Sequence, residues 1–347
     1  MTATLPPDIV DFELPDELIA VEPPEAHGVS RDCVRLMVVR GTRLSHAYFR
    51  DLGSFLREGD LLVVNTSATI AAAVNATRES GAGVVVHFAG PSRDGAWLVE
   101  VRHPDQHGPV LDMAPGETLR LEAGADLQLL SPLTPHRARL WEASLGGTVP
   151  VSEWLARHAR PIAYSHSRRR WPLSEYQTVF ARTPGSAEMP SAGRPFSLEL
   201  VADLVSRGIA FAPLVLHAGV SSLETDELPP AERFEVPGTT ARLINATRQA
   251  GHRVIAVGTT VVRAVETVAA ADGTATSGAG WTDLVLSSDR PVRAFDGLIT
   301  GWHEPRSSHL LLLESVAGHD ALSRAYTAAL DEGYRWHEFG DSCLLLR

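Results

Sequence analysis

The sequence predicts an α/β domain with a mainly parallel sheet, interrupted by a small inserted antiparallel β-barrel. Apolar runs typical of buried strands alternate with helical runs before residue 72 and after residue 150, which favours a parallel sheet covered by helices. From 74 to 145 the pattern changes to short runs of alternating apolar and polar residues. A chain of 347 residues with 44% hydrophobic residues is long enough to build both parts.

The inserted segment is predicted to be a barrel because its runs are short, evenly spaced and separated by turn residues. The strings "GVVVHFAG", "GAWLVEVRH", "ETLRLEA", "DLQLLSP" and "RARLWEASL" follow one another with Gly or Pro between them. Closing such strands on themselves removes exposed sheet edges. We therefore expect a barrel domain at 73–149 and an α/β domain formed by 1–72 together with 150–347.

The α/β part divides into elements by its periodicity. Helices are predicted at 197–208 and 239–251, with a buried strand, "IAFAPLVLHAG", between them. The string "RVIAVGTTVVRAVE" at 253–266 is a further strand, which ends at Gly258 and passes directly into a helix. A last helix and a closing strand are predicted in "LSRAYTAALDEGYRWHEFGDSCLLL".

Composition narrows the class of protein. The formal net charge of −11 argues against bulk attraction to nucleic acid or to an anionic membrane, so a nucleic-acid site would have to be a local basic patch. Cys33 and Cys343 are the only cysteines, which indicates neither a disulfide framework nor a structural zinc site. The sequence shows no signal-peptide pattern and no bilayer-length apolar run, so we expect a soluble, cytoplasmic monomer without a membrane partner.

Polar residues recur where the predicted strands end. Asn65 closes one strand, His217 another and Gly258-Thr259-Thr260 a third, while His303 and Ser307 follow a fourth. Because the carboxyl ends of parallel strands meet at one edge of a sheet, we expect these groups to line one crevice. The start of a helix at Gly258 suits an anion or a sugar edge, since its first N–H groups are unpaired.

Each of these residues also has a simpler interpretation. A threonine after Gly258 can cap the following helix, His217 can be a core histidine, and Arg263 can pair with Glu266 on its own helix rather than bind a ligand. His217 and His303 lack the spacing of a metal site, so no metal is expected.

Eight strings, in this order, carry a resemblance to a known family. They are "FELPDELIA", "GDLLVVN", "YQTVFAR.PGS", "PSAG..F", "LVLHAG", "RVIAVGTT.VRA.E", "DGLIT..H.P.SS" and "YR...FGD..LL", and they extend from Phe12 to Leu346. The chain resembles the QueA family, the S-adenosylmethionine:tRNA ribosyltransferase-isomerases of queuosine biosynthesis. The resemblance implies that the ribosyl part of S-adenosylmethionine is transferred to a 7-aminomethyl-7-deazaguanine in tRNA and isomerised, without a metal or second cofactor.

Together, the strand-end pattern and the resemblance assign three sets of candidate residues. Proton transfer is expected from His217, His303 and Asp341. Binding of S-adenosylmethionine is expected from Asn65, Ser191, Gly193, Phe196, Gly258, Thr259, Thr260, Arg263 and Ser307. The candidate contact with tRNA is the run Arg168-Arg169-Arg170-Trp171, followed by Tyr176, because basic groups beside aromatic rings suit a nucleic-acid backbone and an unstacked base. A solvated loop is the alternative for this run.

The chain departs from the family pattern at several polar positions. Ala68 and Ala73 stand where the pattern has arginines, and Arg194-Pro195 stands where it has Leu-His. The pattern Asn-Phe-His-Leu-Pro is here 301–305, Gly-Trp-His-Glu-Pro. Three functions therefore stay open: ribosyl transfer to tRNA, the same donor with a small-molecule acceptor, and a non-catalytic nucleoside- or RNA-binding role on the same scaffold.

Overall fold

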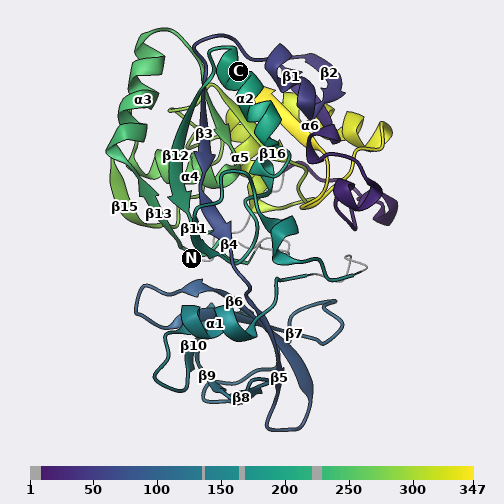
Figure 1. The fold of residues 1–347 in the computed structure, drawn as a ribbon, viewed down its shortest axis with the longest axis vertical. Helices are drawn as coiled ribbons and strands as arrows, with labels where there is room; N and C mark the ends of the chain where they lie inside the picture. Colours follow the sequence, from purple (N-terminus) through teal and green to yellow (C-terminus); the bar gives the residue numbers. More distant parts are fainter. Residues whose placement is uncertain (1–8, 135–136, 164–168, 221–228) are drawn as a thin grey trace.

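The computed structural model describes residues 9–134, 137–163, 169–220 and 229–347. Figure 1 shows two parts, a nine-stranded sheet with helices on both faces and, beyond one end of it, a closed six-stranded barrel. The predicted α/β fold with an inserted antiparallel barrel is confirmed. No helix in the described ranges is long and apolar enough to cross a membrane.

The large sheet is mixed, with its parallel strands at the centre. Its order is β15-β13-β12-β3-β14-β16-β17-β1-β2. The four adjacent strands β12, β3, β14 and β16 are parallel to one another, whereas the pairings of β12 with β13 and of β16 with β17 are antiparallel. The strand bounds are β1 Arg35–Arg40, β2 Arg43–Tyr48, β3 Leu61–Asn65, β12 Ala210–Leu216, β13 Glu232–Val236, β14 Val254–Val257, β15 Gly278–Thr282, β16 Gly297–Gly301 and β17 Ser342–Leu346.

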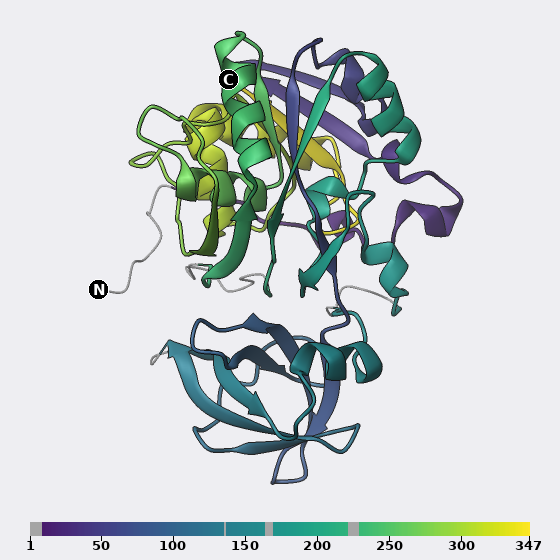
Figure 2. The ribbon, with the colours of Figure 1, turned by 60° about the vertical axis from the view of Figure 1, so that its left-hand side comes forward.

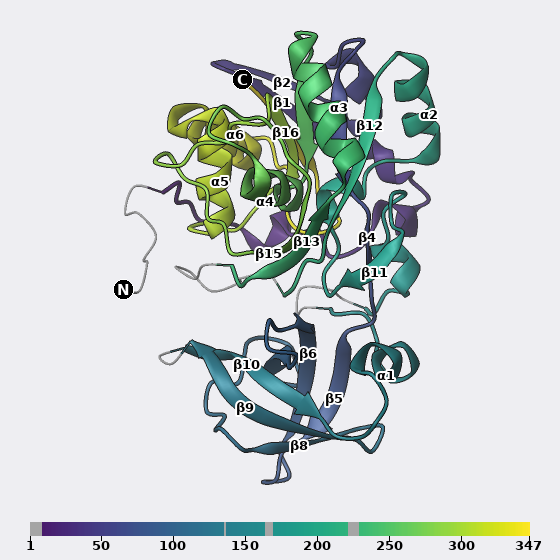
Figure 3. The ribbon, with the colours of Figure 1, turned by 90° about the vertical axis from the view of Figure 1, so that its left-hand side faces the viewer.

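Both faces of the sheet are buried, which explains the continuous apolar run of β3. Leu61 and Val63 pack into one apolar cluster, and Leu62 and Val64 pack into another on the opposite face. Helices α3 (Gly238–Gln249), α4 (Thr259–Val268), α5 (Ser308–Ala317) and α6 (His319–Asp331) cover the first face (Figure 3). Helix α2 (Leu198–Ser206) and the 3-10 helix Phe49–Ser54 cover the second.

The barrel closes in the order β10-β7-β6-β5-β8-β9 and lies beyond the carboxyl ends of the central parallel strands (Figure 2). Its strands are β5 Ala73–Thr77, β6 Gly83–Pro91, β7 Trp97–Arg102, β8 Thr118–Leu121, β9 Asp126–Thr134 and β10 Arg137–Leu145, followed by α1 Val151–His158. A two-stranded parallel sheet of β4 (Ser67–Thr69) and β11 (Thr183–Ser186) joins the chain's paths into and out of the barrel. The exact domain boundaries at 72/73 and 149/150 stay a prediction.

Five short 3-10 helices complete the described secondary structure. They are Asp16–Leu18, Pro24–His27, Arg31–Cys33, Leu173–Tyr176 and Ser191–Gly193. The last of these, η6, contacts β16 at the sheet edge where the central strands end.

Candidate functional site

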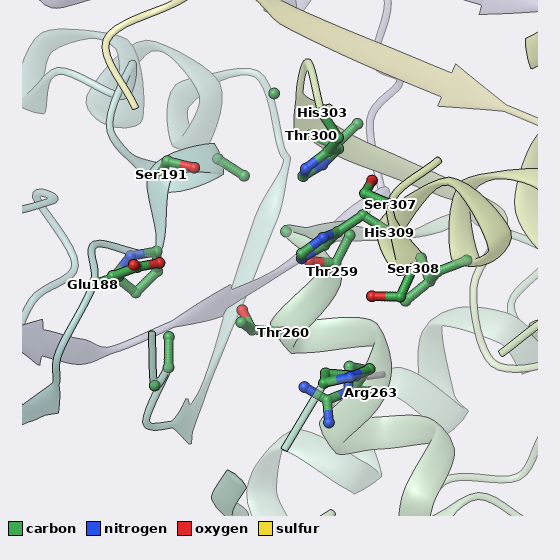
Figure 4. Close-up of a pocket in the computed structure, with 18 of the residues that line it drawn as sticks. Glu188, Ser191, Thr259, Thr260, Arg263, Thr300, His303, Ser307, Ser308 and His309 are labelled. Carbon is green, nitrogen blue, oxygen red and sulfur yellow. The ribbon is translucent and has the colours of Figure 1, made fainter. Parts of the chain in front are cut away.

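A pocket of about 190 Å³ lies at the carboxyl ends of the central strands. Figure 4 shows the first turns of α4 and α5 on one side of it, with Glu188 and Ser191 opposite. Val220 lines the pocket and also belongs to the apolar core of the barrel, so the pocket borders both parts of the molecule. Among the predicted site residues, the lining includes Ser191, Gly258, Thr259, Thr260, Arg263, His303 and Ser307.

Gly258 determines how α4 enters the pocket. Its φ of 99° is in the left-handed region, so β14 turns into α4 without an intervening loop, and a residue with a side chain would be strained there. No side chain caps the helix, contrary to the simpler interpretation of the two threonines. Thr259 is buried and Thr260 half-buried, and both stand at the positive end of the helix dipole.

Asn65 does not line the pocket but holds it together from behind. Its side-chain amide donates to the carbonyl of Leu216 over 2.8 Å and to the Thr260 hydroxyl over 3.3 Å. Its side-chain oxygen accepts from the N–H groups of Ser67 and Leu216 over 3.0 and 3.1 Å. Asn65 therefore positions Thr260 relative to the ends of two strands, and its role is structural support for the site.

Arg263 lines the pocket, but its guanidinium already donates hydrogen bonds to protein groups. Its guanidinium forms an ion pair with Glu232 and donates to the carbonyls of Leu284 over 3.1 Å and Thr282 over 3.2 Å. The expected alternative partner, Glu266, instead accepts from two backbone N–H groups. Arg263 is thus a neutralised part of the pocket wall, which weakens the prediction that it grips an anion directly.

The first turn of α5 brings Ser307 into the same pocket. Ser307 is the N-cap residue, yet its hydroxyl does not cap the helix, and the side chain is only 8% exposed. Within the described part of the chain, the Ser307 Oγ has no hydrogen-bond partner. Ser308 and His309 follow it on the pocket wall.

Two histidines stack on each other beside this turn. The rings of His303 and His309 are parallel within 3°, with centroids 4.4 Å apart. Burial, and then the neighbouring His309 and His337, hold the pKa of His303 well below its usual range. Burial and then Arg263 lower the pKa of His309 to about 4. Both imidazoles are therefore neutral near pH 7 and can accept a proton.

Part of the pocket lining is acidic. Glu188, Glu304 and Glu338 line it around His337, whose Nε2 lies 3.1 Å from a Glu304 oxygen. Burial alone would lower the pKa of His337, but the hydrogen bond to Glu304 and the nearby carboxylates raise it overall. The pocket lining therefore combines two uncapped helix starts with the group Glu188, Glu304 and Glu338, which we call the acidic side.

Several predicted residues lie elsewhere. Phe196 is fully buried between Phe49 and Phe180 on the α2 face, and Gly193 is buried close to the Thr178 side chain, so both serve packing. The Asp341 carboxylate accepts from the N–H groups of Arg35 and Arg335, over 2.6 and 2.8 Å, and is not part of the pocket lining.

His217 also lies outside the lining, although its neighbours Ala218 and Gly219 belong to it. Its Nδ1 is 2.7 Å from the Ser67 hydroxyl, which in turn is 2.6 Å from the Ser186 hydroxyl. Burial and then Arg233 lower the pKa of His217. This places His217 at the junction with the β4–β11 sheet, where it supports the fold instead of facing the pocket.

Only some of the residues predicted to contact tRNA are exposed on the surface. Arg168 lies outside the described residues. Arg169 and Arg170 are exposed, and the Arg169 guanidinium sits 3.7 Å above the Trp171 ring. Tyr176 is buried against Phe339, so it cannot stack on a base in this conformation.

The departures from the family pattern at Arg194 and Ala73 have structural roles away from the pocket, whereas those at Gly301, Trp302 and Glu304 belong to its lining. Arg194 is 2% exposed and pairs with Glu25 over 2.9 Å and Glu175 over 3.3 Å. Ala73 is buried in the barrel core. The missing histidine at Pro195 is therefore not replaced at the same position, whereas His309 supplies an imidazole to the pocket from another element.

Sequence reasoning did not select Glu188, Trp302, Glu304, His309 or His337 as site residues. His309 follows the predicted Ser307-Ser308 helix start, and Glu304 is adjacent to His303, so the strand-to-helix spacing could have found both. Glu188 and His337 reach the pocket from separate loops, which no local pattern reveals. No group of three or more His, Cys, Asp or Glu in the described ranges could hold a metal ion.

The chain belongs to the queuosine biosynthesis protein family, whose model matches residues 8–345. It is 37% identical to the S-adenosylmethionine:tRNA ribosyltransferase-isomerase of Moorella thermoacetica, over 97% of this chain and 98% of that protein. The protein of the same name from Symbiobacterium thermophilum is 36% identical, with the same coverage. The crystal structure of S-adenosylmethionine tRNA ribosyltransferase from Thermotoga maritima matches with a TM-score of 0.55 and 31% identity, over 97% of this chain and 99% of that one. The resemblance inferred from the sequence is confirmed.

Replacing His309 by Gln is expected to make the fold less sensitive to acid. Between the ordinary histidine pKa of 6.5 and the folded value of about 4, the unfolded chain takes up a proton that folded His309 refuses. The wild-type free energy of unfolding should therefore decrease as the pH is lowered from about 6.5 to about 4, by at most about 1.4 kcal/mol per pH unit from this residue. Urea unfolding at a series of pH values measures the slope. The matched control is His107→Gln, a side chain that is 74% exposed. Equal slopes for wild type and His309→Gln would show that the pKa of His309 is not lowered in the folded protein.

Proposed function

We propose that the chain is an S-adenosylmethionine-dependent ribosyltransferase-isomerase that modifies tRNA. It transfers the ribosyl part of S-adenosylmethionine to the aminomethyl group of a 7-deazaguanine base and isomerises it to an epoxycyclopentane, with loss of adenine and methionine. The observation that carries this proposal is the neutral pair His303 and His309, beside two helix starts in one pocket. Membership of the family and the names of its relatives support it.

The proposed chemistry requires a base near the donor's 5′ carbon. A sulfonium makes the hydrogens on this carbon acidic and is a good leaving group, so the protein has to position the donor and move a proton. The Thr300 hydroxyl lies 2.9 Å from Nε2 of His303 and fixes the orientation of that ring. One neutral imidazole of this pair takes the proton. The positive charge that it gains then disfavours protonation of the second ring.

Adenine release from S-adenosylmethionine tests this proposal. We expect one adenine per modified nucleoside when the tRNA carries the aminomethyl base, and none with the unmodified tRNA. His303→Asn should reduce the rate by roughly 10²-fold or more, as expected for loss of a general base. Adenine release with the free base but not with the tRNA would favour a small-molecule acceptor. Binding of either ligand without adenine release would favour the non-catalytic alternative.

The acceptor is proposed to approach over the basic residues next to the barrel. Arg160 donates to Asn75 on β5 over 2.8 Å, and its pKa is lowered by burial and then by the nearby Arg170. Positive charge therefore extends from the barrel to Arg169 and Arg170, although the net charge of the chain is negative. A role in tRNA modification would also agree with the predicted cytoplasmic location.

The double variant Arg169→Ala, Arg170→Ala is expected to weaken tRNA binding and reduce its salt dependence. Each lost phosphate contact should lower the slope of log K against log salt by about 0.7–0.9. Binding titrations between about 50 and 200 mM salt measure it. The control is Arg207→Ala, which removes a surface arginine paired with Asp203 on α2. An unchanged slope in the double variant would assign these arginines to a solvated loop.

A further inference from the structure

We propose that the first turns of α5 and α4 form a subsite for the α-carboxylate of the methionine part of S-adenosylmethionine. The inference rests on the proposed function and specifies how the donor is oriented in the pocket. It places an anion at Ser307 and Thr259, and it places the donor's cationic groups toward the acidic side. Figure 4 shows Ser307 and Ser308 on one side of this corner and Thr259 and Thr260 on the other.

Ser307 is the residue that indicates a ligand at this corner. The residue is only 8% exposed, its Oγ is buried, and it lines the pocket. Its Oγ has no hydrogen-bond partner within the residues that the structure describes, although N-cap serines ordinarily accept from the following turn. A buried polar group without a partner is rare in folded proteins and calls for one, such as a ligand oxygen.

The two helix starts add a fixed positive potential. Helices α4 and α5 each have ten residues, and neither has a side-chain cap at its start. Their first N–H groups are not used by intrahelical bonds, and the positive ends of both dipoles lie at the same pocket. Such a pair of helix starts suits a carboxylate, to which the Ser307 hydroxyl can donate.

The charge of the pocket selects a zwitterionic ligand over a polyanion. Among the described residues, four carboxylates line it, those of Glu188, Glu232, Glu304 and Glu338, against the single guanidinium of Arg263. That guanidinium already pairs with Glu232. A tRNA phosphate would be repelled by this lining, whereas S-adenosylmethionine carries an ammonium and a sulfonium beside its carboxylate and has a net positive charge. The carboxylate then belongs at the helix starts and the two cations toward Glu188 and Glu304.

Calorimetric titration of the donor and of decarboxylated S-adenosylmethionine tests the subsite. Wild type should bind the decarboxylated compound at least about tenfold more weakly, the loss expected for a charge-assisted hydrogen bond. Ser307→Ala should weaken binding of the donor by about tenfold but hardly change binding of the decarboxylated compound. Ser315→Ala is the matched control, because Ser315 is also buried on α5 but bonds within the helix to Leu312. It should leave both affinities unchanged.

A second variant separates binding from folding. Ser307→Asp supplies the missing cap, so its thermal unfolding midpoint should be equal to or above that of wild type, while its carboxylate repels that of the donor. We expect at least about tenfold weaker binding of S-adenosylmethionine by this variant, with tRNA affinity unchanged.

The other outcomes overturn specific claims. Equal affinity of wild type for the two compounds would overturn the subsite and leave the proposed function standing. Weaker tRNA binding by Ser307→Asp, with unchanged donor binding, would indicate that the first turns of α4 and α5 bind a phosphate. This result would also overturn the carboxylate subsite. Failure of wild type to bind S-adenosylmethionine at all would overturn the proposed function itself.

Discussion

The buried side chain of Asn65 is the constraint on which the pocket depends. Its amide joins the end of β3, the end of β12 and the first turn of α4 through four hydrogen bonds. A buried amide with all its groups satisfied rigidifies its surroundings, and its removal would leave both the N–H and the carbonyl of Leu216 without these partners. The position of Thr260 relative to the rest of the pocket follows from this one side chain.

The same edge of the sheet connects the two parts of the molecule. Directly after Asn65 the chain enters β4 and then the barrel, and Ser67 links this passage to Ser186 on the returning strand and to His217. Val220 joins the pocket to the barrel core. A pocket at this junction can take a small donor at the strand ends while a macromolecular acceptor lies against both parts.

The large features were predictable because they depend on local pattern. Burial on both faces produces the continuous apolar run of β3, and the shift to short alternating runs marks the barrel. The sequence pattern of Gly258, two threonines and a following helix predicted a crevice wall, and these residues line the pocket. The strand-end rule also placed His303 and Ser307 there, since they follow β16 at the same sheet edge.

The direction of individual side chains was not predictable in the same way. Arg263 points to Glu232, 31 residues away in sequence and on another element, so its own helix gives no sign of the pairing. Phe196 and Asp341 lie in motif strings, but tertiary packing places one in the core and makes the other an acceptor for the N–H groups of Arg35 and Arg335. Glu188 and His337 reach the pocket from two loops that are distant in sequence, so their place in the lining follows from the fold alone.

A crystal structure of the chain with bound S-adenosylmethionine tests most directly whether this pocket is the donor site. The donor should lie between α4, α5 and the segment 188–192, with its carboxylate within hydrogen-bonding distance of the Ser307 Oγ and the first N–H groups of α5. Its sulfonium should face the acidic side, and its 5′ carbon should lie next to the His303 and His309 pair. A donor bound outside this pocket, or bound with its carboxylate toward Glu304, would contradict the assignment.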